Sequence, residues 1–463
     1  MTEHRDGEQI ERDLLFEAAR DREQSLSRRG FITLSAGAVL LAACGGGGPQ
    51  NNPAAGGGGG GSGGASYDGP NVELSFWNGF TGGDGPFMRD LVQRFNKENP
   101  KVQVKMNVQE WADFYTKLPS AVASGRGPEV AIMHIDQVAT NAARNVILPL
   151  DAAAKALKLE EADFAPVIWK AGEFRGQRYG LPLDMHPLGF YYNKKVMEKA
   201  GLDPAKPPQT RDDYEAALEE LKGKDIEGHW VSPFLFTGGL MFQSLVWQFG
   251  GELYAPDGSE ATYNSPQGVE ALTWMVDLVN KGYSPENVAQ DAEHTAFQND
   301  KNAFIWNGIW QINEYGKNKE LEWGVAPLPQ IGSEKAAWAS SHNFVLPRQR
   351  DADKNKTEAA QFFANWVIEK SNTWAKAGQI PASTKVRESA DFKQLEEQSQ
   401  FANQVPYLHF APTVPGIADT QAETLDAAVN NAVLGKQEPK AALDEAVQKG
   451  NKLLEENRKK YET

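Results

Sequence analysis

The 463-residue chain contains a single cysteine, and it has fewer basic than acidic residues. Because Cys44 has no second cysteine to pair with, no intramolecular disulfide can form, even in an oxidising compartment. The 47 Lys and Arg against 62 Asp and Glu leave a net charge of −15. This balance argues against binding to nucleic acid and against electrostatic attachment to anionic lipid.

Several signatures of catalysis and of metal binding are also missing. The seven histidines stand singly, without an HExxH pair, so we expect no metal site and no other cofactor. The glycines after Trp77 fit neither a P-loop nor a dinucleotide fingerprint, and Gly-x-Ser-x-Gly is absent. Ser341 and His342 are adjacent, so on a strand they would point to opposite faces. Acidic pairs such as Glu110 with Asp184 could serve a glycoside hydrolase, so this function stays open.

The N-terminal segment has the features of an export signal. Arg28 and Arg29 precede an apolar run at 31–43, which is shorter than the roughly 20 residues that span a bilayer. The run ends in Leu-Ala-Ala before Cys44 and resembles a twin-arginine lipoprotein signal. We therefore expect 1–43 to be a signal peptide, Cys44 to be lipidated, and the protein to be anchored to the outer face of the cytoplasmic membrane, in a periplasm or at the cell surface. The Gly-rich stretch 44–70 reads as a flexible tether.

The remaining body, close to 400 residues, is long enough for two lobes with substantial cores. Alternating apolar residues predict strands at 72–77 and 102–108, and the continuous apolar run at 130–133 predicts a buried parallel strand. Helical spacing separates these strands, and cap residues predict further helices after Thr210 and Ser265. The alternation of strand and helix predicts an α/β protein with a mostly parallel sheet.

Aromatic, amide and carboxylate residues follow the predicted strands, where ligands bind in open α/β sheets. A sugar matches this combination, because its C–H faces stack on aromatic rings and its hydroxyls pair with polar groups. The candidate ligand-binding residues are Trp77, Phe80, Thr81, Gly82, Trp111, Asp136, Asp184, His186, Trp247, Asn307, Gly308 and Trp310.

Some of these candidates have a structural interpretation as well. Trp247 lies in an apolar run and is equally compatible with the core. Asp136 can cap a helix, and His186, like His342, can be a structural histidine. Trp310 favours a ligand role, because the preceding Gly308 permits a close approach.

Eight short motifs in order resemble a known family. They are LSFWN at 74–78, RFNKENP at 94–100, GPEV at 127–130, GLPL at 180–183, YYNK at 191–194, PQTRDDY at 208–214, WNGIW at 306–310 and GVAPLP at 324–329. In this order they are similar to the family-1 extracellular solute-binding proteins of ABC importers, the maltose- and trehalose-binding class.

The resemblance implies a two-lobed, periplasmic-binding-protein-like fold of type II, with a mostly parallel sheet in each lobe and a multi-strand hinge. We expect the N-terminal lobe to contain 71–183 and 303–340, and the C-terminal lobe to contain 184–302 and 341–463. The chain should cross between them near 181–188, 302–306 and 340–346. The family's ligand contacts match Asp136, Trp247, Gly308 and Trp310, while 77–83 and 184–186 lie in matching loops.

The resemblance implies a monomeric, non-enzymatic receptor that closes on a sugar. It would deliver this small-molecule ligand to the transmembrane subunits of an ABC permease with a cytoplasmic ATPase. Relatives often carry an aromatic residue after the GLPL segment, where this chain has 185–187, MHP. A glycerol phosphate, polyamine or amino acid therefore stays open as the ligand. Two further functions also stay open, a surface hydrolase acting on polysaccharide and a scaffold whose cleft is vestigial.

Overall fold

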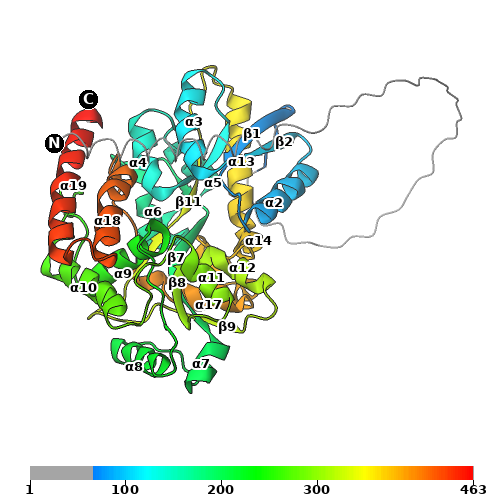
Figure 1. Cartoon of the computed structure of the whole chain (residues 1–463). Coiled ribbons are helices and arrows are strands. Elements are labelled where there is room, and N and C mark those ends of the chain that lie inside the picture. Colours follow the sequence, from blue (N-terminus) through cyan, green and yellow to red (C-terminus); the bar gives the residue numbers. More distant parts are fainter. Residues whose placement is uncertain (1–65, 462–463) are drawn as a thin grey trace, which may run out of the picture. The chain divides into compact units, whose positions relative to one another are not determined.

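The computed structural model describes residues 66–461 (Figure 1). The proposed signal peptide with Arg28 and Arg29, the lipidation site Cys44 and most of the Gly-rich tether lie outside the described residues. In the described part, two large sheets are each packed against helices, a third sheet has only two strands, and the α/β class is confirmed.

The first sheet contains the strands predicted from the start of the body. Its order is β2-β1-β3-β11-β6. Strand β1 is parallel to β2 and to β3, whereas β11 runs antiparallel to both β3 and β6. The strand bounds are β1 (Val72–Asn78), β2 (Val102–Val108), β3 (Val130–His134), β6 (Leu181–Pro182) and β11 (His342–Val345).

Aromatic side chains bind the helices to this sheet. Phe363, on α13 (Lys354–Glu369), lies edge-on to Phe76 of β1, with ring centroids 5.2 Å apart. It also packs against Phe95 of α2 (Gly85–Glu98) at 4.9 Å. All three rings are fully buried. The apolar face of each helix therefore covers the predicted strands and forms the core of the first lobe.

The second sheet is built around one long strand, β7 (Asp184–Asn193), in which every residue is buried. Four strands pair with it, all antiparallel, and β13 is parallel to β10. Their bounds are β8 (Phe304–Gly308), β9 (Trp323–Ala326), β10 (Ala337–Ser340), β12 (Ile380–Pro381) and β13 (Leu408–His409).

The strand directions correct one detail of the expected fold. We expected a mostly parallel sheet in each lobe, but the second sheet is mostly antiparallel because β7 runs against its neighbours. A continuous apolar run shows that a strand is buried on both faces. It does not show the direction of the strand's partners, which come from distant parts of the chain.

The strand pairing also differs from the expected division of the chain. Strands β8, β9 and β10, expected in the N-terminal lobe, pair within the second sheet, and β11, expected in the C-terminal lobe, lies in the first. The crossing expected near 302–306 is therefore absent from the described strands, since β8 pairs with β7. The chain passes between the sheets at Leu183, between β6 and β7, and at Ser341, between β10 and β11. It passes a third time after β11, before β12 pairs with β7 in the second sheet. The sequence locates these strands but does not specify their partners.

The remaining elements cover the two sheets and connect them (Figure 1). The helices are α3 (Trp111–Ala123), α4 (Ile135–Ala143), α5 (Asp151–Leu157), α6 (Pro166–Ala171), α7 (Lys194–Ala200), α8 (Arg211–Lys222), α9 (Leu240–Gln248), α10 (Pro266–Asn280), α11 (Ala292–Gln298), α12 (Ile312–Lys317), α14 (Ser371–Ala375), α15 (Thr384–Arg387), α16 (Ala390–Lys393), α17 (Glu396–Ala402), α18 (Ile417–Val433) and α19 (Pro439–Tyr461). Short elements are η1 (Glu161–Asp163), η2 (Leu235–Gly239), η3 (Ile309–Gln311), η4 (Val405–Tyr407), β4 (Glu173–Phe174) and β5 (Gln177–Arg178).

Two helix starts follow the predicted caps. The Thr210 hydroxyl accepts a hydrogen bond from the backbone N–H of Asp213 at 3.2 Å, at the start of α8. The Ser265 hydroxyl accepts one from Gly268 at 3.3 Å, at the start of α10. Each hydroxyl satisfies a backbone donor that has no partner within the helix.

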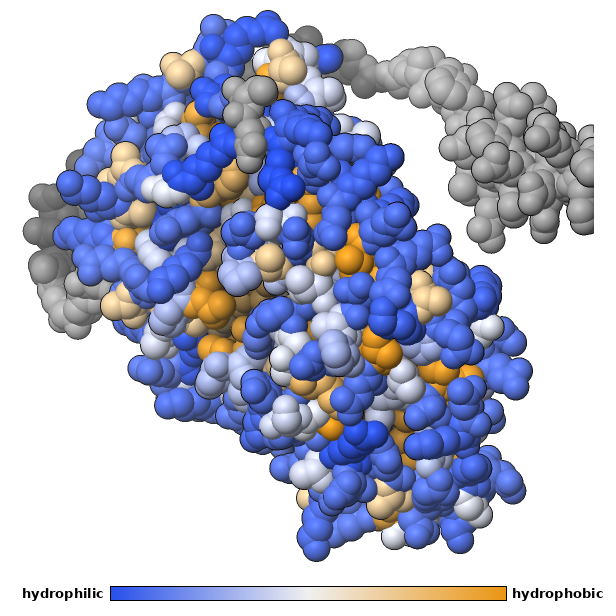
Figure 2. Space-filling view, turned by 90° about the vertical axis from the view of Figure 1, so that its left-hand side faces the viewer, coloured by the Kyte–Doolittle hydropathy of each residue, from blue (hydrophilic) through white to orange (hydrophobic). Residues whose placement is uncertain are grey.

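The exterior of the described body is mainly polar. Figure 2 shows one face on which hydrophilic residues dominate and hydrophobic ones appear mainly in small separate patches. Among the residues that the structure describes, no helix is both long enough and apolar enough to cross a membrane.

Helix α18 packs against α4, α10 and α19, and it carries a carboxyl group without a partner. Both carboxylate oxygens of Asp426 are enclosed and lack a hydrogen bond, and burial raises the pKa of Asp426 to about 7. Because the folded pKa is higher than that of an unfolded aspartate, near 3.9, the folded protein holds this proton more tightly. Stability from this group is present below pH 4 and is lost as the pH rises to about 7.

We predict that Asp426→Asn raises the free energy of unfolding by about 1–3 kcal/mol at pH 8, because an amide avoids the burial of a charge. The gain should shrink steadily as the pH falls towards 4. Urea unfolding across this pH range measures the difference. The exposed Asp351 is the matched control, and its Asn variant should change stability by less than about 0.5 kcal/mol. An equal gain at every pH would contradict the prediction.

Candidate functional site

A cavity of about 610 Å³ lies where the two sheets meet, and its lining comes from both. The first sheet supplies the loop after β1, the end of β3 and the start of β11. The second sheet supplies β7, β10 and the segment after β8. Helices α3, α4, α9, α12 and α18 also contribute to the wall. The cavity thus includes carboxyl ends of strands, the position expected for a ligand site in an α/β protein.

The cavity brings together six of the twelve predicted ligand-binding residues. These are Thr81, Gly82, Trp111, Asp136, His186 and Trp310. The other six do not line it: Trp77, Phe80, Asp184, Trp247, Asn307 and Gly308. Ligand contact by each of the twelve stays a prediction.

Three of the six residues outside the lining support the residues inside it. Phe80 is buried and lies edge-on beneath Trp111, with ring centroids 5.7 Å apart. Gly308 lies directly under the ring of Trp310. Asp184 is fully buried and binds two cavity histidines. These residues shape the site without facing its interior.

The remaining three lie elsewhere in the fold. Trp247 is 6% exposed and stacks on His409 at 4.6 Å, which matches its structural interpretation. Trp77 lines a separate surface pocket beside Glu129. Asn307 is buried, and its side-chain oxygen accepts a hydrogen bond from the N–H of Gly308 at 2.7 Å.

Three half-buried tryptophans surround the cavity: Trp111, Trp310 and Trp338. Two of them rest on glycines, because a Cβ on Gly79 or on Gly308 would come within 2.1 Å of the overlying indole ring. Sequence reasoning missed Trp338, which is on β10. The available signal was its position two residues before Ser340, where a crossing between lobes was expected.

Several polar atoms at the cavity lack a hydrogen-bond partner within the protein. They are Asp84 Oδ1, Asp136 Oδ1, Gln243 Oε1, Ser340 Oγ and Gln379 Oε1. Burial raises the pKa of Asp136 to about 6, and burial also raises the pKa of Asp84. Buried polar groups are normally hydrogen-bonded. These enclosed oxygens therefore have unused hydrogen-bonding capacity in the wall of the cavity.

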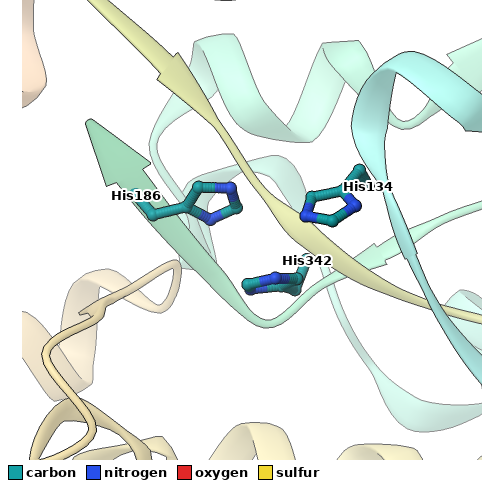
Figure 3. A group of neighbouring side chains, drawn as sticks. All are labelled: His134, His186 and His342. Atoms are coloured by element: carbon teal, nitrogen blue, oxygen red, sulfur yellow. The ribbon is translucent and has the colours of Figure 1, made fainter. Parts of the chain in front are cut away.

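Three histidines that stand far apart in the sequence meet at the cavity wall (Figure 3). His134 of β3 and His342 of β11 are directly opposite each other in an antiparallel pair, and His186 of β7 is opposite Ser340 of β10. One ring nitrogen of each histidine lies within 4.8 Å of those of the other two. No spacing of histidines along the chain signals this cluster, because strand pairing creates it.

Asp184 orients two of these rings. Its oxygens accept hydrogen bonds from Nδ1 of His342 at 2.7 Å and from Nδ1 of His186 at 3.2 Å. They also accept from the backbone N–H of His342 at 2.9 Å and from the indole N–H of Trp374 at 2.6 Å. Burial alone would raise the pKa of Asp184, but the field and hydrogen bonds of His342 and His186 outweigh it and hold this pKa well below its usual range.

The same contacts determine which ring nitrogens are free. A carboxylate only accepts hydrogen bonds, so Nδ1 of His186 and Nδ1 of His342 carry the proton. Burial lowers the pKa of His186 to about 4 and holds the pKa of His134 well below its usual range. His186 is therefore neutral at pH 7, and its Nε2 can accept a hydrogen bond or bind a metal.

Comparison with known proteins places the chain in a family. Residues 80–374 match the model for the bacterial extracellular solute-binding proteins, well over half of the chain. The chain belongs to this family. The resemblance expected from the eight motifs is confirmed, and the family is one of binding proteins rather than of enzymes.

Individual relatives differ in what their names say they bind. The maltodextrin-binding protein of Bacillus subtilis is 25% identical over 398 residues, which cover 81% of this chain and 88% of that protein. The sn-glycerol-3-phosphate-binding periplasmic protein of Escherichia coli is 25% identical over 417 residues, 82% of this chain and 92% of that protein. A solved structure, the cyclic α-maltosyl-1,6-maltose binding protein of Arthrobacter globiformis, superposes with a TM-score of 0.72 at 24% identity, covering 84% of this chain and all of the other. The two-lobed fold is thereby confirmed.

We predict that Gly308→Ala moves the ring of Trp310 into the cavity, because the new Cβ takes the space that the ring occupies. The free energy of unfolding should fall by less than about 1.5 kcal/mol, since the ring is half-buried and can swing away. The ¹⁹F NMR spectrum of 5-fluorotryptophan-labelled protein, assigned with Trp310→Phe, should show a displaced Trp310 resonance. Gly316→Ala is the control, because nothing lies within 4 Å of its Cβ position. An unmoved resonance in Gly308→Ala would refute the packing.

Proposed function

We propose that this protein is the exported receptor of an ABC importer, that it binds a sugar in the cavity between its lobes, and that it delivers the sugar to a membrane permease. One observation carries the proposal. Half-buried tryptophan rings lie around the cavity beside polar atoms that lack partners. Family membership supports the receptor role.

The residues that line the cavity suit both the apolar C–H faces and the hydroxyl groups of a pyranose ring. Its C–H faces stack on aromatic rings such as Trp111, Trp310 and Trp338, and its hydroxyls donate to oxygens such as Asp136 Oδ1 and Ser340 Oγ. A solute that lacked one hydroxyl would leave a buried oxygen unpaired, which is the physical basis of selectivity. The cavity's volume, about 610 Å³, lies within the range of small-molecule sites.

The charges around the cavity favour a neutral solute over a phosphate. None of the described residues that line the cavity is Lys or Arg. Three acidic residues, Asp84, Asp136 and Glu314, do line it. Proteins usually recognise phosphate with Arg, Lys or backbone N–H groups. The glycerol-phosphate-binding relative keeps such a ligand as the second candidate, and the cavity's acidic lining weighs against it.

A two-lobed receptor acts by closing on its solute. Residues from both sheets line the cavity, so a solute that touches both stabilises the closed arrangement over the open one. We propose that a monomer in the closed form docks on the transmembrane subunits of the permease, and that a cytoplasmic ATPase powers transport.

We predict that Trp310→Ala weakens sugar binding about 10- to 100-fold, because a stacked ring and its buried area are lost. Isothermal titration calorimetry of the Cys44→Ser chain with maltose-series oligosaccharides measures the affinity, with glycerol 3-phosphate as the competing ligand class. Trp230→Ala is the matched control, since this half-buried tryptophan does not line the cavity. It should bind as tightly as the parent chain.

Three outcomes would count against the proposal. Equal affinities in both tryptophan variants would remove Trp310 from the site. Binding of glycerol 3-phosphate in place of every sugar would overturn the solute class. Formation of shorter oligosaccharides during the titration, detected by chromatography, would support the polysaccharide hydrolase instead.

Export and lipidation form a separate part of the proposal, because Arg28, Arg29 and Cys44 lie outside the described residues. We predict that cells expressing the wild-type chain retain it in the membrane fraction and label it with a radioactive fatty acid. Cys44→Ser should lose the label and leave the membrane fraction, since a tether without lipid has no anchor. Arg28→Lys/Arg29→Lys should leave precursor inside the cell. Membrane retention of an unlabelled Cys44→Ser protein would contradict a lipid anchor.

A further inference from the structure

The three histidines of the cavity wall have the composition of a metal site. His134, His186 and His342 each place a ring nitrogen within 4.8 Å of the other two, and their rings face a common space (Figure 3). Three imidazole nitrogens around one Zn²⁺, at about 2.0–2.1 Å each, lie roughly 3.3 Å apart in a tetrahedral arrangement. A shift of the ring nitrogens by about 1.5 Å would bring them from 4.8 Å to that separation.

The hydrogen bonds that the Nδ1 atoms of the three rings make also fit a metal site. Nδ1 of His186 and Nδ1 of His342 both donate to the buried carboxylate of Asp184, which leaves Nε2 of each ring free. Nδ1 of His134 lies 2.7 Å from the hydroxyl oxygen of Tyr115, which also accepts the backbone N–H of His134 at 2.9 Å. When Nδ1 of His134 is the donor in this contact, its Nε2 is free to bind a metal. Histidines that bind metals typically donate the other ring N–H to a carboxylate or to another oxygen, and this contact fixes the ring.

We propose that His134, His186 and His342 bind one transition-metal ion, Zn²⁺ in the first instance, through their Nε2 atoms. Three imidazoles suit Zn²⁺ and other borderline ions better than Mg²⁺ or Ca²⁺, which prefer oxygen ligands. The buried Asp184 is a positioning residue, because it acts on the metal only through the two rings. No other cluster of this kind occurs among the described residues.

The ion would leave one coordination position facing the cavity. All three histidines line the cavity, and the unpartnered Oδ1 of Asp84 belongs to the same wall. Three protein ligands with an open fourth position allow an exogenous oxygen to bind. A hydroxyl of the solute is such an oxygen, so the metal would contribute directly to solute recognition. This last step depends on the proposed sugar-binding function, whereas metal binding itself does not.

Calorimetric titration of the Cys44→Ser chain, prepared without a histidine tag, with ZnCl₂ tests the site. We expect one ion per chain, with micromolar or tighter affinity, and X-ray absorption showing three imidazole nitrogens at about 2.0–2.1 Å. Replacing Zn²⁺ by Co²⁺ should give the intense visible bands of a four- or five-coordinate ion. Surface binding would give the weak spectrum of octahedral Co²⁺ and would overturn the proposal.

Variants locate the ion. His134→Gln, His186→Gln and His342→Gln should each abolish stoichiometric binding, whereas His294→Gln, a half-buried histidine on α11 outside the cavity, should keep it. Asp184→Asn should weaken affinity about 10- to 100-fold and shift the Co²⁺ bands, because the rings lose their carboxylate partner. A fold defect alone would not shift those bands. Equal Zn²⁺ affinity in all variants would refute the assignment.

The variants of His186 and His342 also remove a partner of the buried Asp184, so melting temperature must be measured beside affinity. Absorption and Co²⁺ spectra of the parent chain do not depend on those variants and test the proposal even if they fail to fold. Sugar binding without any Zn²⁺ binding would overturn the metal site and leave the receptor proposal standing. Zn²⁺ binding without any sugar binding would support the metal site and count against the receptor proposal.

Discussion

The carboxylate of Asp184 is the constraint on which the site depends. It is fully buried at the start of β7, and it accepts hydrogen bonds from His342 of the first sheet, from His186 of its own strand and from Trp374 of α14. A buried charge is costly unless it is paired and hydrogen-bonded. Hydrogen bonds from both sheets therefore compensate the charge of Asp184 where the chain passes from one sheet to the other. They hold the two sheets in place relative to each other at the cavity.

The aromatic wall depends on that arrangement. Trp374 lies against Phe80 at 4.7 Å, and Phe80 in turn supports Trp111 at the cavity. Trp111 also stacks on His342 at 5.7 Å. A continuous series of packed rings thus runs from Trp374, which is bonded to the buried Asp184, to Trp111 at the cavity surface. The ring contacts therefore connect the cavity wall to the hydrogen bonds of Asp184 between the two sheets.

The sequence predicted the elements better than their partners. The strands at 72–77, 102–108 and 130–133 follow from apolar patterns, and the starts of α8 and α10 follow from Thr210 and Ser265, because these signals are local. The direction of β7's neighbours, the lobe to which β8 and β11 belong, and the exclusion of Trp247 from the cavity depend on long-range pairing. Half of the candidate ligand residues nevertheless line one cavity.

The histidine cluster shows why local patterns fail at such a site. A metal motif is visible in a sequence when a helix or a turn brings its ligands together, as in paired spacings. Here the register of β3 with β11 places His134 opposite His342, and the shared carboxylate of Asp184 brings His186 beside them. Three separate segments therefore meet only after both sheets have formed. This polar constellation at the junction of the two sheets is therefore a consequence of their assembly, which no local pattern in the sequence records.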